Sequence, residues 1–216
     1  MSELDLRLYV VTSGTGARTV EAATAAAAAG AGVVQVRHQE IDDRAALELV
    51  AAVARAVAAT GTGTRVLVDD RVDVAWVARA QGLPVHGVHL GQEDLPVPEV
   101  RRLLGEEAVI GLTTGTLPLV QATHAVAENL DYVGAGPYRL TPTKDSGRPA
   151  LGAAGYPALV AASPVPVVAI GSIDVPDVAA LRRTGVAGCA VVRAVMDATD
   201  PGRAARDLLR AWDEGA

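Results

Sequence analysis

The segment 134–144, with the sequence GAGPYRLTPTK, contains the only lysine of a chain in which Lys and Arg together number 19. Two glycines and a proline open this segment and predict a tight turn that exposes backbone N–H groups. Thr141, Thr143 and Lys144 then supply two hydroxyl groups and one compact ammonium. A loop of this kind suits an anion, most naturally a phosphate or a pyrophosphate.

Gln35 and Arg37 form a second polar pair, within the valine-rich segment GVVQVRH. Alternation along a strand places the two side chains on the same face. The guanidinium of Arg37 can hold a phosphate through two parallel donors, with Gln35 directed the same way. An ion pair between Arg37 and a neighbouring acid is the alternative, and the sequence leaves both open.

Asp70 and Asp94 follow two consecutive apolar segments, in VLVDD and HLGQED. Two carboxylates at neighbouring strand ends can share one Mg²⁺ that keeps most of its waters and meets a diphosphate. Taken singly, Asp70 fits better as the N-cap of a helix that begins at Val72, and the two roles are compatible. Asp69 provides a spare carboxylate.

Two later strand ends carry the segments GSI and VVR, which contain Gly171, Ser172, Val192 and Arg193. Backbone N–H groups at such positions often bind phosphate, whereas ordinary turn chemistry is the alternative. His89 is the one histidine expected near these groups, and a structural core histidine is equally compatible with its position.

Composition narrows the classes of function. The formal charge is −6 and the isoelectric point is near 5.2, which argues against general nucleic-acid binding. The single cysteine, Cys189, excludes an intramolecular disulfide and fits a buried inert thiol. No apolar run reaches the roughly 20 residues that span a bilayer, so a soluble cytoplasmic protein without membrane partners is expected.

Eight β-branched apolar segments alternate with helical sequence along the chain. The expected strands begin at Leu6, Gly32, Thr64, Gly87, Ala108, Asp131, Val165 and Ala187. The expected helices are 19–29, 42–59, 72–80, 98–104, 117–128, 156–162 and 176–184, with helical sequence again before Trp212. Eight consecutive parallel units predict an α/β fold, a single (β/α)8 TIM barrel that forms one domain over residues 1–216. The polar residues above would then surround one mouth of the barrel.

With these residues in this order, the chain resembles the thiamine-phosphate synthases, also called thiamine-phosphate pyrophosphorylases. The resemblance covers almost the whole domain, and HLGQED followed by GPYRLTPTK is its most specific part. The matching segments are QVRHQ, DDRVDVA, GVHLGQED, GLTTGT, GPYRLTPTK, VAIGSI and AVVRAV.

The resemblance implies a transferase that joins 4-amino-2-methyl-5-hydroxymethylpyrimidine diphosphate to 4-methyl-5-hydroxyethylthiazole phosphate, with Mg²⁺. The family's reaction is drawn as dissociative, so the protein stabilises departing pyrophosphate and needs no nucleophile. Lys144 and Arg37 are the expected catalytic residues, and Asp70 and Asp94 the expected metal ligands. The resemblance further implies substrate contacts for Gln35, Gln39, Asp69, His89, Thr113, Thr141, Thr143, Gly171, Ser172, Val192 and Arg193.

Four positions depart from the family pattern. Gln39 stands where the family has a lysine, Asp69 replaces a usual asparagine, Ser172 a usual glycine and Arg193 a usual serine. One cation for the diphosphate is therefore missing, while Arg193 adds a cation near the expected thiazole phosphate. These changes keep open a thiazole tautomerase-like barrel or a non-catalytic phosphate-binding barrel. The sequence also leaves the oligomeric state open, a homo-oligomer included.

Overall fold

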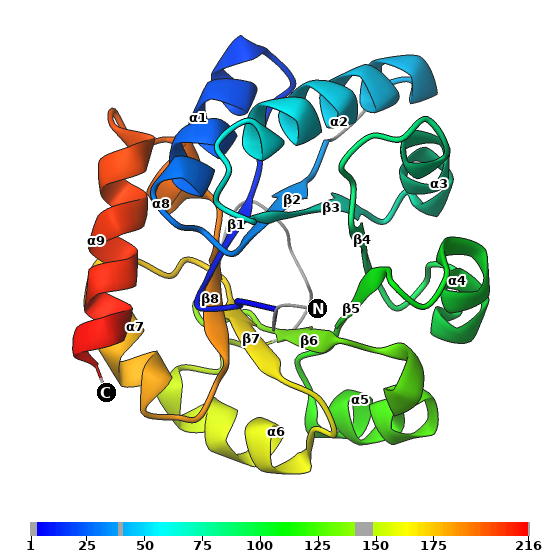
Figure 1. The fold of residues 1–216 in the computed structure, drawn as a ribbon. Coiled ribbons are helices and arrows are strands. Elements are labelled where there is room, and N and C mark those ends of the chain that lie inside the picture. Colours follow the sequence, from blue (N-terminus) through cyan, green and yellow to red (C-terminus); the bar gives the residue numbers. More distant parts are fainter. Residues whose placement is uncertain (1–3, 39–40, 141–148, 216) are drawn as a thin grey trace.

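A computed structural model describes residues 4–38, 41–140 and 149–215 of the chain. Eight parallel strands close into a barrel in which each strand pairs with its neighbours in sequence order, and β1 pairs with β8. Figure 1 shows this barrel within a ring of helices. The predicted (β/α)8 TIM barrel is therefore confirmed.

The strands are short, as expected for a barrel of this size. They are β1 Leu8–Val11, β2 Val33–Val36, β3 Arg65–Asp69, β4 Gly87–Leu90, β5 Val109–Thr113, β6 Tyr132–Ala135, β7 Val167–Ile170 and β8 Gly188–Val191. The helices are α1 Ala17–Ala28, α2 Asp43–Ala58, α3 Val72–Ala80, α4 Val97–Leu104, α5 Leu117–Ala122, α6 Tyr156–Ala162, α7 Val175–Arg182, α8 Arg193–Met196 and α9 Pro201–Glu214. Two 3₁₀ segments, η1 Thr123–Asn129 and η2 Ala153–Gly155, complete the described elements.

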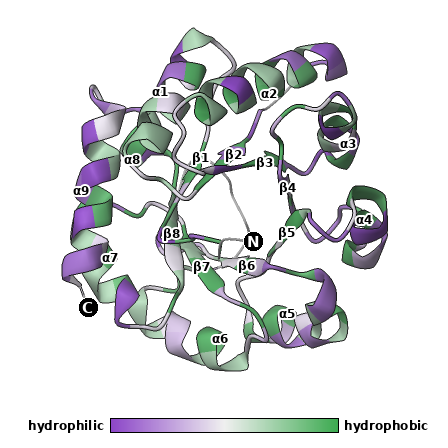
Figure 2. Cartoon of the chain, viewed as in Figure 1, coloured by the Kyte–Doolittle hydropathy of each residue, from purple (hydrophilic) through white to green (hydrophobic). Residues whose placement is uncertain are grey.

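Alternation along each strand divides the core into two parts. On β1, Leu8 and Val10 face the helices, whereas Tyr9 and Val11 point into the barrel. Figure 2 shows strands in which hydrophobic residues predominate, surrounded by helices that carry both hydrophobic and hydrophilic residues.

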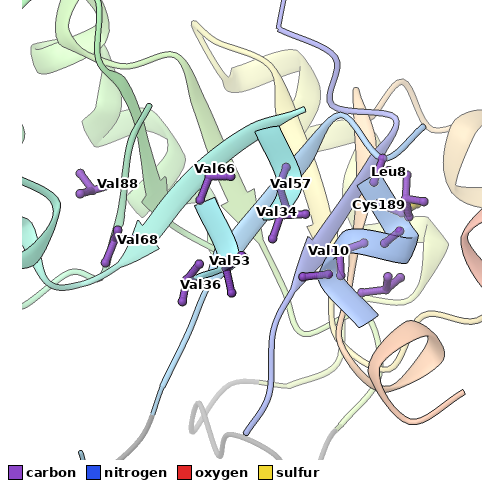
Figure 3. Packing of buried hydrophobic residues seen from close by; sticks show 14 of the residues in the cluster. Leu8, Val10, Val34, Val36, Val53, Val57, Val66, Val68, Val88 and Cys189 are labelled. Atoms are coloured by element: carbon purple, nitrogen blue, oxygen red, sulfur yellow. The ribbon is translucent and has the colours of Figure 1, made fainter. Parts of the chain in front are cut away.

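Helix α2 shows how the outer layer packs on the barrel. Its buried residues recur at helical spacing, and they include Val50, Val53 and Val57. Figure 3 shows Val53 and Val57 beside Val34 of β2 and Val66 of β3. The helix is pinned at its start by Asp42, whose side chain accepts a hydrogen bond from the backbone N–H of Ala45 at 2.9 Å.

One expected helix is shorter than predicted. The segment 117–128 was expected to be one helix, but α5 ends at Ala122 and continues as the 3₁₀ segment η1, in which Val126 is non-helical. Thr123 Oγ1 donates to the carbonyl oxygen of Val120 at 2.6 Å. Thr123, His124 and Val126 are residue types of low helix propensity, which is consistent with a regular helix that ends before them.

None of the helices in the described part of the chain is long and apolar enough to cross a membrane.

Candidate active site

The carboxyl ends of the strands surround a cavity of about 670 Å³. All of the expected site residues that the structure describes line this cavity. They are Gln35, Arg37, Asp69, Asp70, His89, Asp94, Thr113, Gly171, Ser172, Val192 and Arg193. The remaining four, Gln39, Thr141, Thr143 and Lys144, lie outside the described residues. The strand register therefore brings together residues that are far apart in sequence.

Arg37 and Gln35 meet Asp69 at the ends of β2 and β3. Arg37 Nε lies 3.5 Å from Asp69 Oδ2, and Gln35 Nε2 donates a hydrogen bond to Asp69 Oδ1. The ion pair that was the alternative for Arg37 is thus present. It is compatible with anion binding, because an arginine has further N–H donors beyond Nε.

Two tyrosines fill the floor of the cavity and were not anticipated from the sequence. Tyr9 Oη donates to Gln35 Oε1 at 2.6 Å and lies 2.7 Å from Tyr132 Oη. Burial raises the pKa of both phenols, so both carry their proton at neutral pH. The available signal was a tyrosine at an inward position of each of two expected strands, which requires a polar partner for each hydroxyl.

His89 joins this floor to the rim on β5. Its Nδ1 lies 2.8 Å from Tyr132 Oη, and its Nε2 lies 2.9 Å from Thr113 Oγ1. Two glycines make room for these rings: a Cβ at Gly134 would lie 3.1 Å from His89 Cε1, and one at Gly111 would lie 2.1 Å from Tyr132 Cζ. A side chain at Gly111 would therefore collide with the Tyr132 ring, and one at Gly134 would push the His89 ring by a few tenths of an ångström.

Asp70 and Asp94 face a shared space beside Gly91. A carbon at the Cβ position of Gly91 would lie 3.0 Å from Asp94 Oδ2 and 3.9 Å from Asp70 Oδ1. Asp94 Oδ2 accepts the Gly91 N–H at 2.6 Å, and Asp70 has the left-handed backbone angle φ 57°. The N-cap of α3 is Arg71, so the predicted capping role of Asp70 is wrong. The turn at Asp70 places it before that position.

The donor set beside Gly91 fits Mg²⁺. This ion prefers oxygen ligands and is usually held by one or two carboxylates, with water and phosphate oxygens at its other positions. Within residues 4–38, 41–140 and 149–215, no group of three or more His, Cys, Asp or Glu side chains is arranged to hold a metal. A two-carboxylate site for a hydrated ion is consistent with both facts.

The opposite side of the cavity is formed by β7 and β8. Gly171 and Ser172 have φ angles of 118° and 49°, and this turn brings Gly171 against the loop that follows β6, where an added Cβ would lie 2.8 Å from Pro137 Cα. Arg193 Nη2 donates to Ser172 Oγ at 3.1 Å. Arg139 donates to the Ser172 carbonyl oxygen at 3.1 Å, so guanidinium groups approach this turn from two directions.

Asp177 fixes Arg139 in that position. Arg139 Nη1 donates to Asp177 Oδ2 at 2.7 Å, and its guanidinium lies 4.8 Å from the centre of the Tyr138 ring. Burial opposes ionisation of Asp177, but the hydrogen bonds and charge of Arg139 outweigh it and hold the pKa of this carboxyl below its ordinary value.

The fold and the cavity define a class: a (β/α)8 barrel with a polar ligand site at the carboxyl ends of its strands, lined by cationic and acidic groups. Residues 8–195 match the family described as thiamine monophosphate synthase, and the chain belongs to this family.

Relatives agree over nearly the full length. The chain is 56% identical to a thiamine-phosphate synthase of Corynebacterium efficiens, over 98% of this chain and 97% of the relative. It is 37% identical to a thiamine-phosphate synthase of Moorella thermoacetica, over 96% and 95%. The predicted family is confirmed, and these findings support the synthase over the tautomerase-like and non-catalytic alternatives.

Solved structures with the same fold include a member of this family. A thiamine phosphate pyrophosphorylase from Pyrococcus furiosus has a TM-score of 0.83 and 29% identity, with 99% of this chain and 98% of that chain covered. A 3-hexulose-6-phosphate synthase has a TM-score of 0.65 at 16% identity, with 95% of this chain and 99% of that chain covered, and shares the fold alone.

Proposed function

We propose that this protein is a thiamine-phosphate synthase, a transferase that joins 4-amino-2-methyl-5-hydroxymethylpyrimidine diphosphate to 4-methyl-5-hydroxyethylthiazole phosphate. One observation carries the proposal beyond family membership. The carboxylates that follow β3 and β4, Asp70 and Asp94, lie across the barrel from the Ser172–Arg193 pair of β7 and β8, because strands four apart oppose each other in a closed barrel of eight. Arg37 follows β2, on the same side as Asp70. One cavity thus offers two separate anion sites, as two phosphorylated substrates require.

The proposed reaction breaks the C–O bond between the pyrimidine methylene carbon and the diphosphate. The electron pair leaves with pyrophosphate, and the thiazole nitrogen supplies the pair for the new C–N bond. No protein nucleophile is needed, so the protein acts by alignment and by stabilising charge on the leaving group. Arg37 would donate to the diphosphate, and Arg193 with Ser172 would contact the thiazole phosphate.

Mg²⁺, when bound, would neutralise charge on the diphosphate oxygens and so assist departure of pyrophosphate. Asp70 and Asp94 would hold it, since their carboxylates share the space beside Gly91. Asp69 is ion-paired with Arg37, which favours a role for Asp69 in orienting its neighbours rather than in binding metal.

The remaining expected residues would belong to the same two anion sites. Lys144 would neutralise the leaving pyrophosphate, and Gln39 and Thr113 would contact the same diphosphate. Thr141 and Thr143 would reach toward the thiazole phosphate, whose site Gly171 and Val192 complete. These assignments rest on the family resemblance.

One catalytic domain over residues 1–216 is part of the proposal, supported by a barrel whose strands and helices run from Leu8 to Glu214. A cytoplasmic location and a homo-oligomer stay predictions. Cell fractionation would test the location. Sedimentation of the purified protein would test the oligomeric state.

The test is to mix the purified protein with both substrates and Mg²⁺ and to measure thiamine phosphate and pyrophosphate by chromatography. The proposal expects both products in a 1:1 ratio, and neither product when Mg²⁺ is chelated. Calorimetric binding of both substrates without product would instead identify a non-catalytic binding barrel.

A further inference from the structure

A continuous series of side-chain hydrogen bonds crosses the floor of the cavity from β3 to β5. The bonds are Asp69 to Gln35, Gln35 to Tyr9 at 2.6 Å, Tyr9 to Tyr132 at 2.7 Å, Tyr132 to His89 at 2.8 Å and His89 to Thr113 at 2.9 Å. The register places Asp69 directly beside His89 on the neighbouring strand. The hydrogen bonds join the same two residues by the longer route around the barrel interior.

Asp69 determines the orientation of the Gln35 amide. An ionised carboxylate only accepts hydrogen bonds, so the amide atom that faces Asp69 must be the donor Nε2. The Gln35 oxygen is then directed at Tyr9 and accepts its hydroxyl proton. The donor and acceptor roles of its two neighbours therefore determine which end of the Gln35 amide is the nitrogen.

The two buried tyrosines continue the same direction of hydrogen bonding from Gln35 to His89. Each hydroxyl has one proton to donate, and burial keeps both phenols protonated by raising their pKa. The Tyr9 proton is committed to Gln35, so Tyr9 Oη must accept from Tyr132. Tyr132 has then used its own proton, and its oxygen accepts from His89 Nδ1.

We propose that Asp69 is a positioning residue that holds neutral His89 in the tautomer with its proton on Nδ1. His89 Nε2 is then an acceptor, which receives the Thr113 hydroxyl proton in this structure. A substrate group that replaces this hydroxyl must be a hydrogen-bond donor, such as an N–H group on a heterocycle. This last consequence rests on the proposed function, whereas the tautomer does not.

Arg37 explains why an aspartate and an asparagine at position 69 would act differently. Gln35 donates to one carboxylate oxygen while Arg37 Nε faces the other at 3.5 Å. An asparagine has a single acceptor, and the charge of Arg37 attracts its oxygen. The asparagine NH₂ would then face Gln35, whose amide must turn, and every later bond would reverse until His89 carries its proton on Nε2.

The test uses ¹⁵N-histidine NMR, which distinguishes a protonated from an unprotonated ring nitrogen. The chain has only four histidines, and His89→Gln identifies the His89 signals. Spectra over a pH series identify the pH range in which the His89 ring is neutral. The wild-type protein is expected to show a protonated Nδ1 and an unprotonated Nε2, and Asp69→Asn is expected to exchange the two.

Two further variants separate this effect from a general disturbance of the core. Tyr9→Phe leaves the Tyr132 proton directed to His89 Nδ1 and is expected to produce the same exchange. Tyr156→Phe removes another buried hydroxyl, which donates to the Ala135 carbonyl oxygen at 3.0 Å, and is expected to keep the wild-type tautomer. Thermal unfolding of each variant confirms that the barrel is folded.

The inference is overturned if Asp69→Asn keeps the wild-type tautomer, or if His89 in the wild-type protein already has its proton on Nε2. Kinetics add a second readout: Asp69→Asn is expected to raise KM for the pyrimidine diphosphate about tenfold, the effect of one misdirected hydrogen bond. A protein that forms no thiamine phosphate would refute the proposed function and leave the NMR result standing.

Discussion

Arg193 Nη2 donates a hydrogen bond to Ser172 Oγ at 3.1 Å and thereby joins the ends of β7 and β8 on the rim of the cavity. These are two of the positions at which the sequence departs from the family it resembles. The departures are in contact with each other, so they form one altered feature rather than two. A hydroxyl that accepts from the guanidinium keeps the other N–H donors of Arg193 available for an anion.

Arg193→Ala is expected to raise KM for the thiazole phosphate by about tenfold or more, because a hydrogen bond to a charged group contributes roughly 1.5–3 kcal/mol. KM for the pyrimidine diphosphate should change little, since that substrate is proposed to bind across the barrel. Steady-state kinetics with each substrate varied in turn measures both. Arg203→Ala on the exposed face of α9 is the control, and equal effects on both substrates would contradict the assignment.

Lys144→Ala is expected to slow single-turnover formation of thiamine phosphate at saturating substrates by about a hundredfold. The reason is the loss of a cation from the leaving pyrophosphate, which is a transition-state effect. Lys144→Arg keeps the charge and should recover part of the rate in rapid-quench measurements. An alanine variant with the wild-type rate would remove Lys144 from the chemical step.

Arg101 is a buried cation that holds the segment between α4 and β5. Its Nη1 donates to the carbonyl oxygen of Glu106 at 3.1 Å, and its Nη2 donates to the Asn129 carbonyl oxygen and to Asp131 Oδ2 at 3.0 Å each. Arg101→Met should lower the free energy of unfolding by about 3–5 kcal/mol, because these acceptors lose a buried charged partner. Urea denaturation measures the change.

The neighbouring residue provides the matched control for Arg101. Arg102 is 68% exposed and pairs only with Glu99 among the described ion pairs, so Arg102→Met should change the free energy of unfolding by about 0.5 kcal/mol or less. Equal losses for the two variants would show that Arg101 is not a structural anchor.

His86 makes stability depend on pH. Its Nδ1 accepts the backbone N–H of Val66 at 3.0 Å, and burial, followed by the charge of Arg65, holds its pKa below the ordinary 6.5. The neutral form is favoured in the folded state, so its contribution is complete above pH 6.5 and is lost as the pH falls through the lower folded-state pKa.

His86→Asn keeps an acceptor near the position of Nδ1 and does not titrate. Below pH 6.5 the free energy of unfolding of the wild-type protein should therefore fall relative to that of this variant. Denaturation in urea at a series of pH values gives the comparison. Parallel curves from pH 7.5 to pH 5 would mean that His86 titrates alike in the folded and unfolded chains.

The barrel could be predicted from the sequence because each strand is a short apolar run with at least one valine, followed by helical spacing. Val72–Ala80 and Tyr156–Ala162 are helices with the predicted bounds, since their apolar periodicity and flanking residues agree. The break after Ala122 was not predicted, because the apolar spacing continues through residues 123–128 although Thr123, His124 and Val126 are weak helix formers.

The cavity-lining residues were predictable because parallel strands bring their carboxyl ends to one mouth. The hydrogen-bond partners of these residues could not be predicted. Tyr9 looks like an ordinary core residue in LYVV, and its contact with Tyr132 depends on the closure of the barrel over 123 positions of sequence. The contact between Ser172 and Arg193 likewise depends on the turn at Gly171, where positive φ angles direct the serine toward β8.

The central claim is that thiamine phosphate forms in this cavity with Mg²⁺ held by Asp70 and Asp94. The most direct measurement is the Mg²⁺ dependence of single-turnover thiamine phosphate formation by the wild-type protein, Asp70→Asn and Asp94→Asn. Each variant lacks one of two anionic ligands, so the Mg²⁺ concentration for half-maximal rate should rise by about tenfold or more. Unchanged Mg²⁺ dependence in both variants, or no thiamine phosphate from the wild-type protein, would contradict the account.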